Sequence, residues 1–104
     1  MNQRIEKLLA FLKESPNDCF LHHALALEYV KEGNEAEAKK CFEHNLNNDE
    51  GYIATYYHLA KLLERNGDPT NAIAIYEKGM AHAKAAKDMH SYSELQSAYE
   101  DLVY

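Results

Sequence analysis

The chain repeats part of its own sequence with a period of 34 residues, and this period limits the folds that it can adopt. A shift of the 104-residue sequence by 34 positions aligns residues of the same or similar type: Leu25-Ala26 with Leu59-Ala60, Gly33 with Gly67, Asn34 with Asp68, Ala38 with Ala72, Phe42 with Tyr76, and Leu46 with Met80. A fixed period of this length is typical of stacked supersecondary units, each of which buries its apolar face against its neighbours. The sequence therefore predicts a repeat architecture.

Glycines and capping residues divide each repeat into two helices. Gly33 suits the left-handed conformation that follows a helix, and Asn34 with Glu37 forms a capping box that starts the next helix. The arrangement returns at Gly67-Asp68-Pro69, where aspartate caps a helix and proline takes its first position. The turn chemistry and the period together predict helix–turn–helix units.

The repeated positions resemble the tetratricopeptide repeat family, whose pattern is W-x-x-L-G-x-x-Y…A-x-x-x-F…P. His22 and Tyr56 stand at the tryptophan of this pattern, and Tyr29 and Leu63 stand at its tyrosine. The sequence departs from the pattern at His22 and Leu63, and at the closing proline, where Glu50 and Lys84 stand. The chain is identified as similar to small bacterial-type members of this family.

The resemblance implies an all-α fold, an α-solenoid of antiparallel helix pairs in a right-handed superhelix of about six helices. We expect helices at about 2–14, 17–32, 35–48, 52–66, 69–86 and 89–103. We interpret residues 1–104 as a single domain. It comprises an N-terminal capping helix (1–16), two repeats (17–50 and 51–86) and a C-terminal capping helix (87–104).

The last helix fits the pattern only after a two-residue slip in register. The slip places Tyr92, Leu95 and Tyr99 on its packed face, with Asp88 as the N-cap. The polar residues Glu94 and Asp101 are then expected to shield the outer face of the array.

Charge and cysteine usage narrow the classes of partner and compartment. The 17 acidic residues outnumber the 11 basic ones and give a formal charge of −6, which disfavours nucleic acid and anionic membrane surfaces as partners. Cys19 and Cys41 have no CxxC spacing and suit free thiols in a reducing compartment, so we expect a cytoplasmic protein. The charged start of the chain and the lack of a long apolar run predict no targeting or membrane-spanning segment.

Histidines and cysteines are the candidates for catalytic or metal chemistry, and their spacing argues against both. The six histidines are His22, His23, His44, His58, His82 and His90, and no two of them lie three or four residues apart. Neither cysteine completes a zinc spacing with them, and no glycine-rich phosphate loop is present. We therefore expect no catalytic residue, no metal site and no cofactor, and we predict that the chain is not an enzyme.

Function is instead expected on the concave groove that the first helix of each repeat lines in this family. Helical spacing predicts that the groove includes Phe20, His23, Leu27, Val30, Lys31, Tyr57, Lys61, Glu64, Arg65 and His90. An apolar lip beside a basic strip (Lys31, Lys61 and Arg65) suits a peptide with an apolar anchor followed by an acidic group. The alternative is that Lys61 and Arg65 are solvated and paired with neighbouring acids.

The groove lacks the carboxylate clamp by which related co-chaperone modules hold a C-terminal carboxylate. His23, Leu27, His58, His90 and Glu94 occupy the places of the lysines, asparagines and arginine of that clamp. The sequence therefore predicts a non-enzymatic module that binds an unidentified protein or peptide. The alternatives are a self-associating structural subunit and an accessory subunit of a larger complex; we expect a monomer, or at most a weak homo-oligomer.

Overall fold

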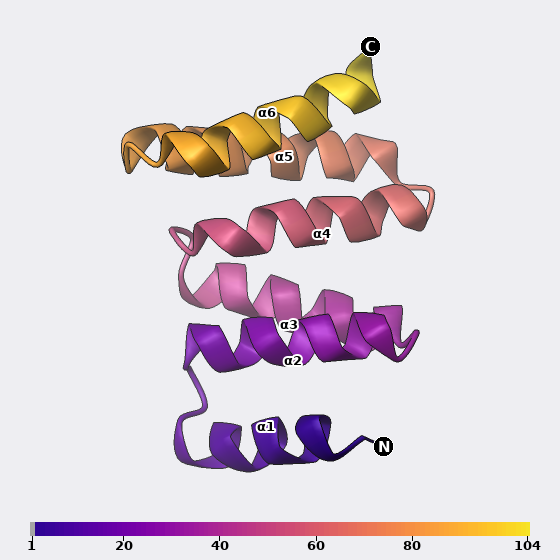
Figure 1. Cartoon of the computed structure of the whole chain (residues 1–104), viewed down its shortest axis with the longest axis vertical. Helices are drawn as coiled ribbons and strands as arrows, with labels where there is room; N and C mark the ends of the chain where they lie inside the picture. Colours follow the sequence, from indigo (N-terminus) through magenta and orange to yellow (C-terminus); the bar gives the residue numbers. More distant parts are fainter. Residues whose placement is uncertain (1) are drawn as a thin grey trace. The chain divides into compact units, whose positions relative to one another are not determined.

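The computed structural model describes residues 2–104, and these residues form an all-α fold of six helices packed in adjacent pairs (Figure 1). The helices are α1 (Gln3–Glu14), α2 (Cys19–Lys31), α3 (Glu35–Asn48), α4 (Ile53–Arg65), α5 (Pro69–Ala85) and α6 (Met89–Val103). The predicted helices are confirmed to within two residues at each end. Residue 1 of the predicted capping segment lies outside the described residues.

Side-chain caps explain where most of the helices begin. Asp18 is the N-cap of α2 and accepts a hydrogen bond from the Leu21 amide, so this helix starts at Cys19 and not at residue 17 as expected. Asp88 caps α6 as predicted and accepts from the Ser91 amide at 3.1 Å. Similar caps from Asn2, Asn34 and Asp68 start α1, α3 and α5.

After α2, α4 and α5, a residue in the left-handed conformation stands directly before the N-cap of the next helix. Gly33 and Gly67 have φ values of 78° and 76°, as the sequence predicted, and each is followed directly by a capping residue. Lys87 takes the same left-handed conformation, with φ of 59°, between α5 and Asp88. Lysine pays a steric cost there that glycine does not, and this turn is where the two-residue slip of the repeat register falls.

The chain divides into two compact units, the first ending at Glu50 and the second beginning at Gly51. The first unit contains α1, α2 and α3. Its core includes a cluster of Ile5, Leu8, Leu12, Ala24 and Leu25, with Leu21, Tyr29 and Cys41 packed against it. The largely buried Glu28 carboxylate is paired with Arg4 at 3.0 Å, so its negative charge is compensated within the same unit.

The second unit contains α4, α5 and α6, and α5 packs against both of the other helices. Tyr56 of α4 and Tyr76 of α5 are buried in the family's aromatic positions, as the sequence predicted. Gly79 on α5 faces Tyr56 and Leu95, which come from α4 and α6 respectively. A residue without a side chain at this point allows both helices to pack closely against α5.

Candidate functional site

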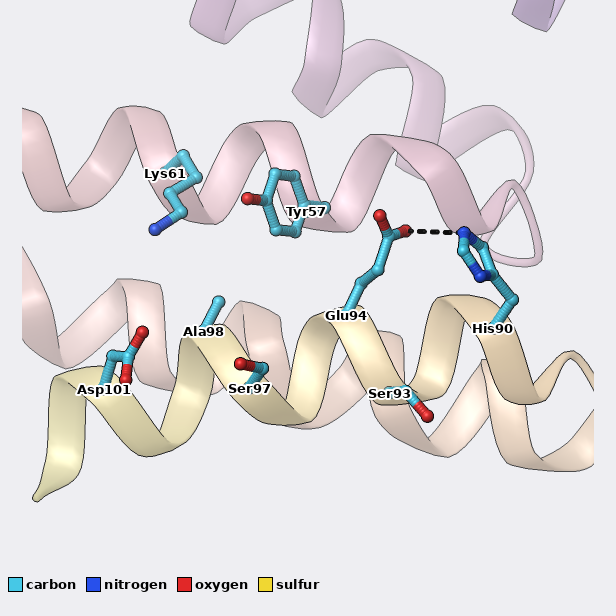
Figure 2. Close-up of a pocket in the computed structure, with 8 residues that line it drawn as sticks. All are labelled: Tyr57, Lys61, His90, Ser93, Glu94, Ser97, Ala98 and Asp101. Atoms are coloured by element: carbon cyan, nitrogen blue, oxygen red, sulfur yellow. Dashed lines mark ion pairs between the residues drawn. The ribbon is translucent and has the colours of Figure 1, made fainter.

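A groove runs between α4 and α6 in the second unit. Its larger hollow has a volume of about 410 Å³ and is lined by Tyr57, Lys61, His90, Ser93, Glu94, Ser97, Ala98 and Asp101. Figure 2 shows Glu94, Ala98 and Asp101 extending from α6 toward α4, while Lys61 extends from α4 toward α6 and the Tyr57 ring lies along α4 with its hydroxyl toward Lys61. The two helices therefore present side chains to a shared concave surface.

A second hollow of about 250 Å³ continues this surface toward the start of the two helices. Its lining residues are Ile53, Ala54, Tyr57, His58, Ser91, Glu94 and Leu95. Tyr57 and Glu94 line both hollows, so they lie where the two meet. We call the combined surface the α4–α6 groove.

Packing beneath the groove fixes the spacing of its two walls. Leu95 is buried at the α5–α6 contact, next to the position that a side chain on Gly79 would occupy. Ala98 is also buried, one turn farther along α6, where its small side chain leaves the larger hollow open. The depth of the groove thus depends on small residues on α5 and α6.

Tyr57 is the aromatic centre of the groove. Its side chain is half-buried, and its ring packs edge-on against the ring of His58, with 5.5 Å between the ring centroids. The Lys61 ammonium lies 5.8 Å from the centroid of the Tyr57 ring, which is within the range of a cation–π interaction. These contacts hold the tyrosine in place while part of its surface stays accessible.

The positive charge of the groove is already paired within the protein. The Lys61 ammonium lies 3.8 Å from Glu64 Oε2, and the same carboxylate oxygen accepts a hydrogen bond from the hydroxyl of the buried Tyr76. Burial, followed by this hydrogen bond to Glu64, raises the pKa of Tyr76 well above its ordinary value, so the phenol remains a donor. The Glu64 carboxylate is therefore held by two contacts, one with Tyr76 and one with Lys61.

The negative charges on α6 are less fully compensated. Glu94 Oε1 lies 3.8 Å from His90 Nε2 across one turn of exposed helix. Asp101 forms no ion pair or hydrogen bond with any residue from 2 to 104, apart from contacts of its own helix backbone. The wall that α6 contributes is thus the acidic side of the groove.

Burial lowers the pKa of His58, and the Arg65 guanidinium lowers it further, while the Glu94 carboxylate opposes both effects by raising it. Histidine already titrates near pH 6.5, so a lowered pKa leaves His58 uncharged at neutral pH. The smaller hollow consequently gains no positive charge from this ring.

The sequence profile of the tetratricopeptide repeat family matches two consecutive segments, residues 21–50 and 53–81, which together make up more than half of the chain. The chain belongs to the tetratricopeptide repeat family. The first match contains most of α2 and all of α3, and the second contains α4 and most of α5. Tetratricopeptide repeats are generally protein-interaction modules and typically have no catalytic activity.

Solved structures of small bacterial proteins are similar to this tetratricopeptide repeat chain. A tetratricopeptide repeat domain protein from Salinibacter ruber, solved by NMR, is 38% identical with a TM-score of 0.81, over 85% of this chain and 89% of that chain. A crystal structure of such a protein from the same organism has 38% identity and a TM-score of 0.79, over 82% and 94%. A protein from Bordetella parapertussis has 26% identity and a TM-score of 0.83, over 98% and 89%. No curated protein matches the chain.

Three of the ten residues predicted for the tetratricopeptide groove line the α4–α6 groove: Tyr57, Lys61 and His90. Glu64 is turned toward the core, where it accepts from Tyr76, and Arg65 follows it at the exposed end of α4. The expected free basic strip is replaced in part by ion pairs, since Lys61 pairs with Glu64 and Lys31 with Glu28 at 3.7 Å. Lys61 thus has the Glu64 partner that the alternative named, and its part in partner binding stays a prediction.

The five remaining predicted residues lie on α2, in the first unit. The Phe20 side chain is 64% exposed, Leu27 and Val30 are half-buried, and Lys31 is exposed. The His23 ring packs against Phe42, with 5.8 Å between the ring centroids. Their part in partner binding stays a prediction.

Glu94 and Asp101 line the groove, although the sequence analysis expected both to shield the outer face of α6; for Glu94 it also named a position of the groove's clamp. The offset of 36 residues that aligns Tyr92 with Tyr56 also aligns Asp101 with Arg65, a predicted groove position. The slipped register of α6 therefore already indicated a groove position for Asp101. Ser93 and Ser97 are found by the same offset, which aligns them with Tyr57 and Lys61.

Metal-binding groups and reactive cysteines bear on whether residues 2–104 carry out chemistry. Within this range no group of three histidine, cysteine, aspartate or glutamate side chains could hold a metal ion. Burial, with a smaller effect from Glu37, raises the pKa of the Cys41 thiol to about 11, which keeps it in the less reactive protonated form. None of the helices described is both long and apolar enough to cross a lipid bilayer.

Proposed function

We propose that this tetratricopeptide repeat chain is a non-enzymatic interaction module that holds a segment of a partner protein in the α4–α6 groove. The observation that carries this proposal is a two-part groove with the half-buried Tyr57 at its centre. Because both cysteines are free, we place the module in a reducing compartment such as the cytoplasm.

The shape and chemistry of the groove support a peptide as its occupant. Apolar surface from Ile53, Ala54 and Leu95 lies in the smaller hollow, and polar side chains surround the larger one. Hollows of this size accommodate individual side chains of a partner, and tyrosine is among the residues that contribute most to binding energy at protein interfaces. A segment that lies along α4 and α6 would contact Tyr57 whichever hollow it fills.

The proposal is tested with a display library of random dodecapeptides, selected on the wild-type protein. The selected peptides are then labelled, and their affinities are measured for wild type and for Tyr57→Ala. We expect a loss of at least about tenfold, since truncation of a central interface residue costs 2 kcal/mol or more, about thirtyfold, at a hot spot.

A matched control variant is available in the first unit. The Phe11 side chain is 57% exposed and lines a different hollow, formed by Ala10, Phe11, Glu14, Ser15 and Leu21. Phe11→Ala removes a comparable aromatic ring and should leave peptide affinity unchanged. The proposal fails if Phe11→Ala weakens binding while Tyr57→Ala does not.

Self-association is a second candidate function, favoured by the exposed apolar side chains outside the groove. These are Leu9, Phe11, Phe20, Met89 and Tyr104. Large apolar side chains that are exposed on one chain can be buried against a second copy of the same chain. Sedimentation velocity over a hundredfold range of concentration tests this candidate, which requires that the mean mass increase with concentration.

A further inference from the structure

The two carboxylates of the α4–α6 groove lie on one face of α6, seven residues apart. Seven residues of α-helix span about 10.5 Å, so Glu94 and Asp101 stand two turns apart, with Ser97 and Ala98 between them. Figure 2 shows both carboxylates extending from α6 toward α4. A partner that lies in the larger hollow therefore has an acidic group at each end of it.

We infer that the α4–α6 groove selects a basic segment of its partner, with a lysine or arginine side chain held between Glu94 and Asp101. This inference rests on the proposed function and reverses the acidic guest expected from the sequence. It concerns the chemistry of the guest and not its identity.

The available positive charge of the groove is small. Lys61 is the one lysine or arginine among the residues that line the two hollows, and its ammonium is already paired with Glu64. Glu64 is itself held by Tyr76, so an acidic guest would compete with an anchored carboxylate. His58 is uncharged at neutral pH because burial lowers its pKa.

α6 itself contributes no lysine or arginine to the acidic wall, and Lys61, which faces the wall from α4, is paired with Glu64. The sequence of α6 contains three carboxylates, Glu94, Glu100 and Asp101, and neither lysine nor arginine. Glu94 acts on the uncharged His58 across the smaller hollow, and it also lies 3.8 Å from His90, whose side chain is 86% exposed while that of Glu94 is 58% exposed. Such an exposed pair contributes little, so a guest cation can replace His90 at small cost.

The groove also matches the apolar stem of a long basic side chain. The methylenes of lysine or arginine can lie on Ala98 and the accessible part of Tyr57, while the cation reaches a carboxylate. Tyrosine attracts cations over its ring, and hydrogen bonds between a cation and a carboxylate are about twice as strong as neutral ones. The aromatic ring, the small apolar surface and the carboxylates of the groove thus all favour a lysine or arginine side chain.

The experiment begins with the charge of the dodecapeptides that the wild-type protein selects from the random library. Their affinities are then compared for wild type and for the double variant Glu94→Gln with Asp101→Asn. Glu6→Gln with Glu43→Gln is the matched control, because it removes the same charge from exposed positions of the first unit. We expect lysine and arginine to be enriched in the selected peptides. The groove variant should lose at least about tenfold in affinity, whereas the control should change by less than about twofold.

The outcomes separate the inference from the proposed function. If the selected peptides carry no excess of basic residues but depend on Tyr57, the inference is overturned and the groove remains the binding site. The inference is also overturned if the groove variant and the control have equal effects on basic peptides. If binding persists in Tyr57→Ala, the proposed function itself fails.

Discussion

Gly79 on α5 and Tyr56 on α4 pack so closely that a methyl group on the glycine would lie 2.6 Å from the Cβ atom of the tyrosine. The same methyl group would lie 3.1 Å from a terminal carbon of Leu95 on α6. One residue of α5 thus sets how closely the two helices that form the groove can pack on it. Tyr56 is buried and its Cβ is fixed to the backbone, so it cannot move aside independently of α4.

We predict that Gly79→Ala destabilises the protein by about 1–3 kcal/mol, as overpacking of a close contact does. Helix propensity alone predicts the opposite sign, a gain of about 1 kcal/mol, because alanine is the better helix former. Urea denaturation measures the difference. The exposed Ala81, two residues away on α5, supplies the control: Ala81→Gly should cost about 1 kcal/mol from propensity alone. A stabilised Gly79→Ala protein would contradict the close contact.

We predict that the Tyr76 hydroxyl and the Glu64 carboxylate stabilise the second unit together. Tyr76→Phe should lower the free energy of unfolding by about 1.5–3 kcal/mol, the range for hydrogen bonds to charged groups. In a double-mutant cycle with Glu64→Gln, the two losses should be less than additive by at least about 0.5 kcal/mol. Additive effects would show that the hydrogen bond contributes nothing to stability.

The pH dependence of stability should contain a contribution from His58. Burial lowers the pKa of this histidine in the folded protein, so the unfolded chain takes up a proton first, near pH 6.5. Protonation of the unfolded state favours unfolding, and stability should therefore fall as the pH decreases below about 7. In thermal melts at pH 7 and pH 5, His58→Gln should lose less stability than wild type over this interval. An equal or larger loss in the variant would contradict the lowered pKa.

Cys41 should be a slow nucleophile in the folded protein. Burial raises the pKa of its thiol to about 11, so roughly one molecule in a thousand carries the thiolate at pH 8. In a Cys19→Ser background, alkylation by iodoacetamide should be at least about tenfold slower in the folded protein than in urea. The rate in the folded protein should still be rising at pH 10. A rate that levels off below pH 9 would contradict the raised pKa.

The helices could be predicted closely from the sequence because their signals are local and repeated. The capping residues Asn34, Asp68 and Asp88 and the left-handed Gly33 and Gly67 act within a few residues of where they stand. The predicted start of α2 was wrong by two residues because Asp18, whose side chain accepts from the Leu21 amide, is the N-cap and not part of the helix. Local chemistry therefore determines most of the helix pattern.

The charge of the candidate site could not be predicted in the same way, because it depends on which side chains meet across helices. Lys61 and Glu64 lie three residues apart on α4, but the position of Glu64 is determined by Tyr76 on a different helix. Asp101 reaches the groove only in the slipped register of α6, which departs from the 34-residue period. The first feature depends on tertiary packing, which a single helical pattern does not encode, whereas the place of Asp101 could have been taken from the slipped register.

The most direct test of the groove as the binding site is an NMR titration of the ¹⁵N-labelled protein with the tightest dodecapeptide from the library. The account predicts the largest amide shift changes around Tyr57 and Lys61 on α4 and around Ser97 and Asp101 on α6, with small changes in α1–α3. The same titration of Tyr57→Ala should produce much smaller changes at equal peptide concentration. Shift changes confined to the first unit, or to the exposed face of α5, would contradict the account.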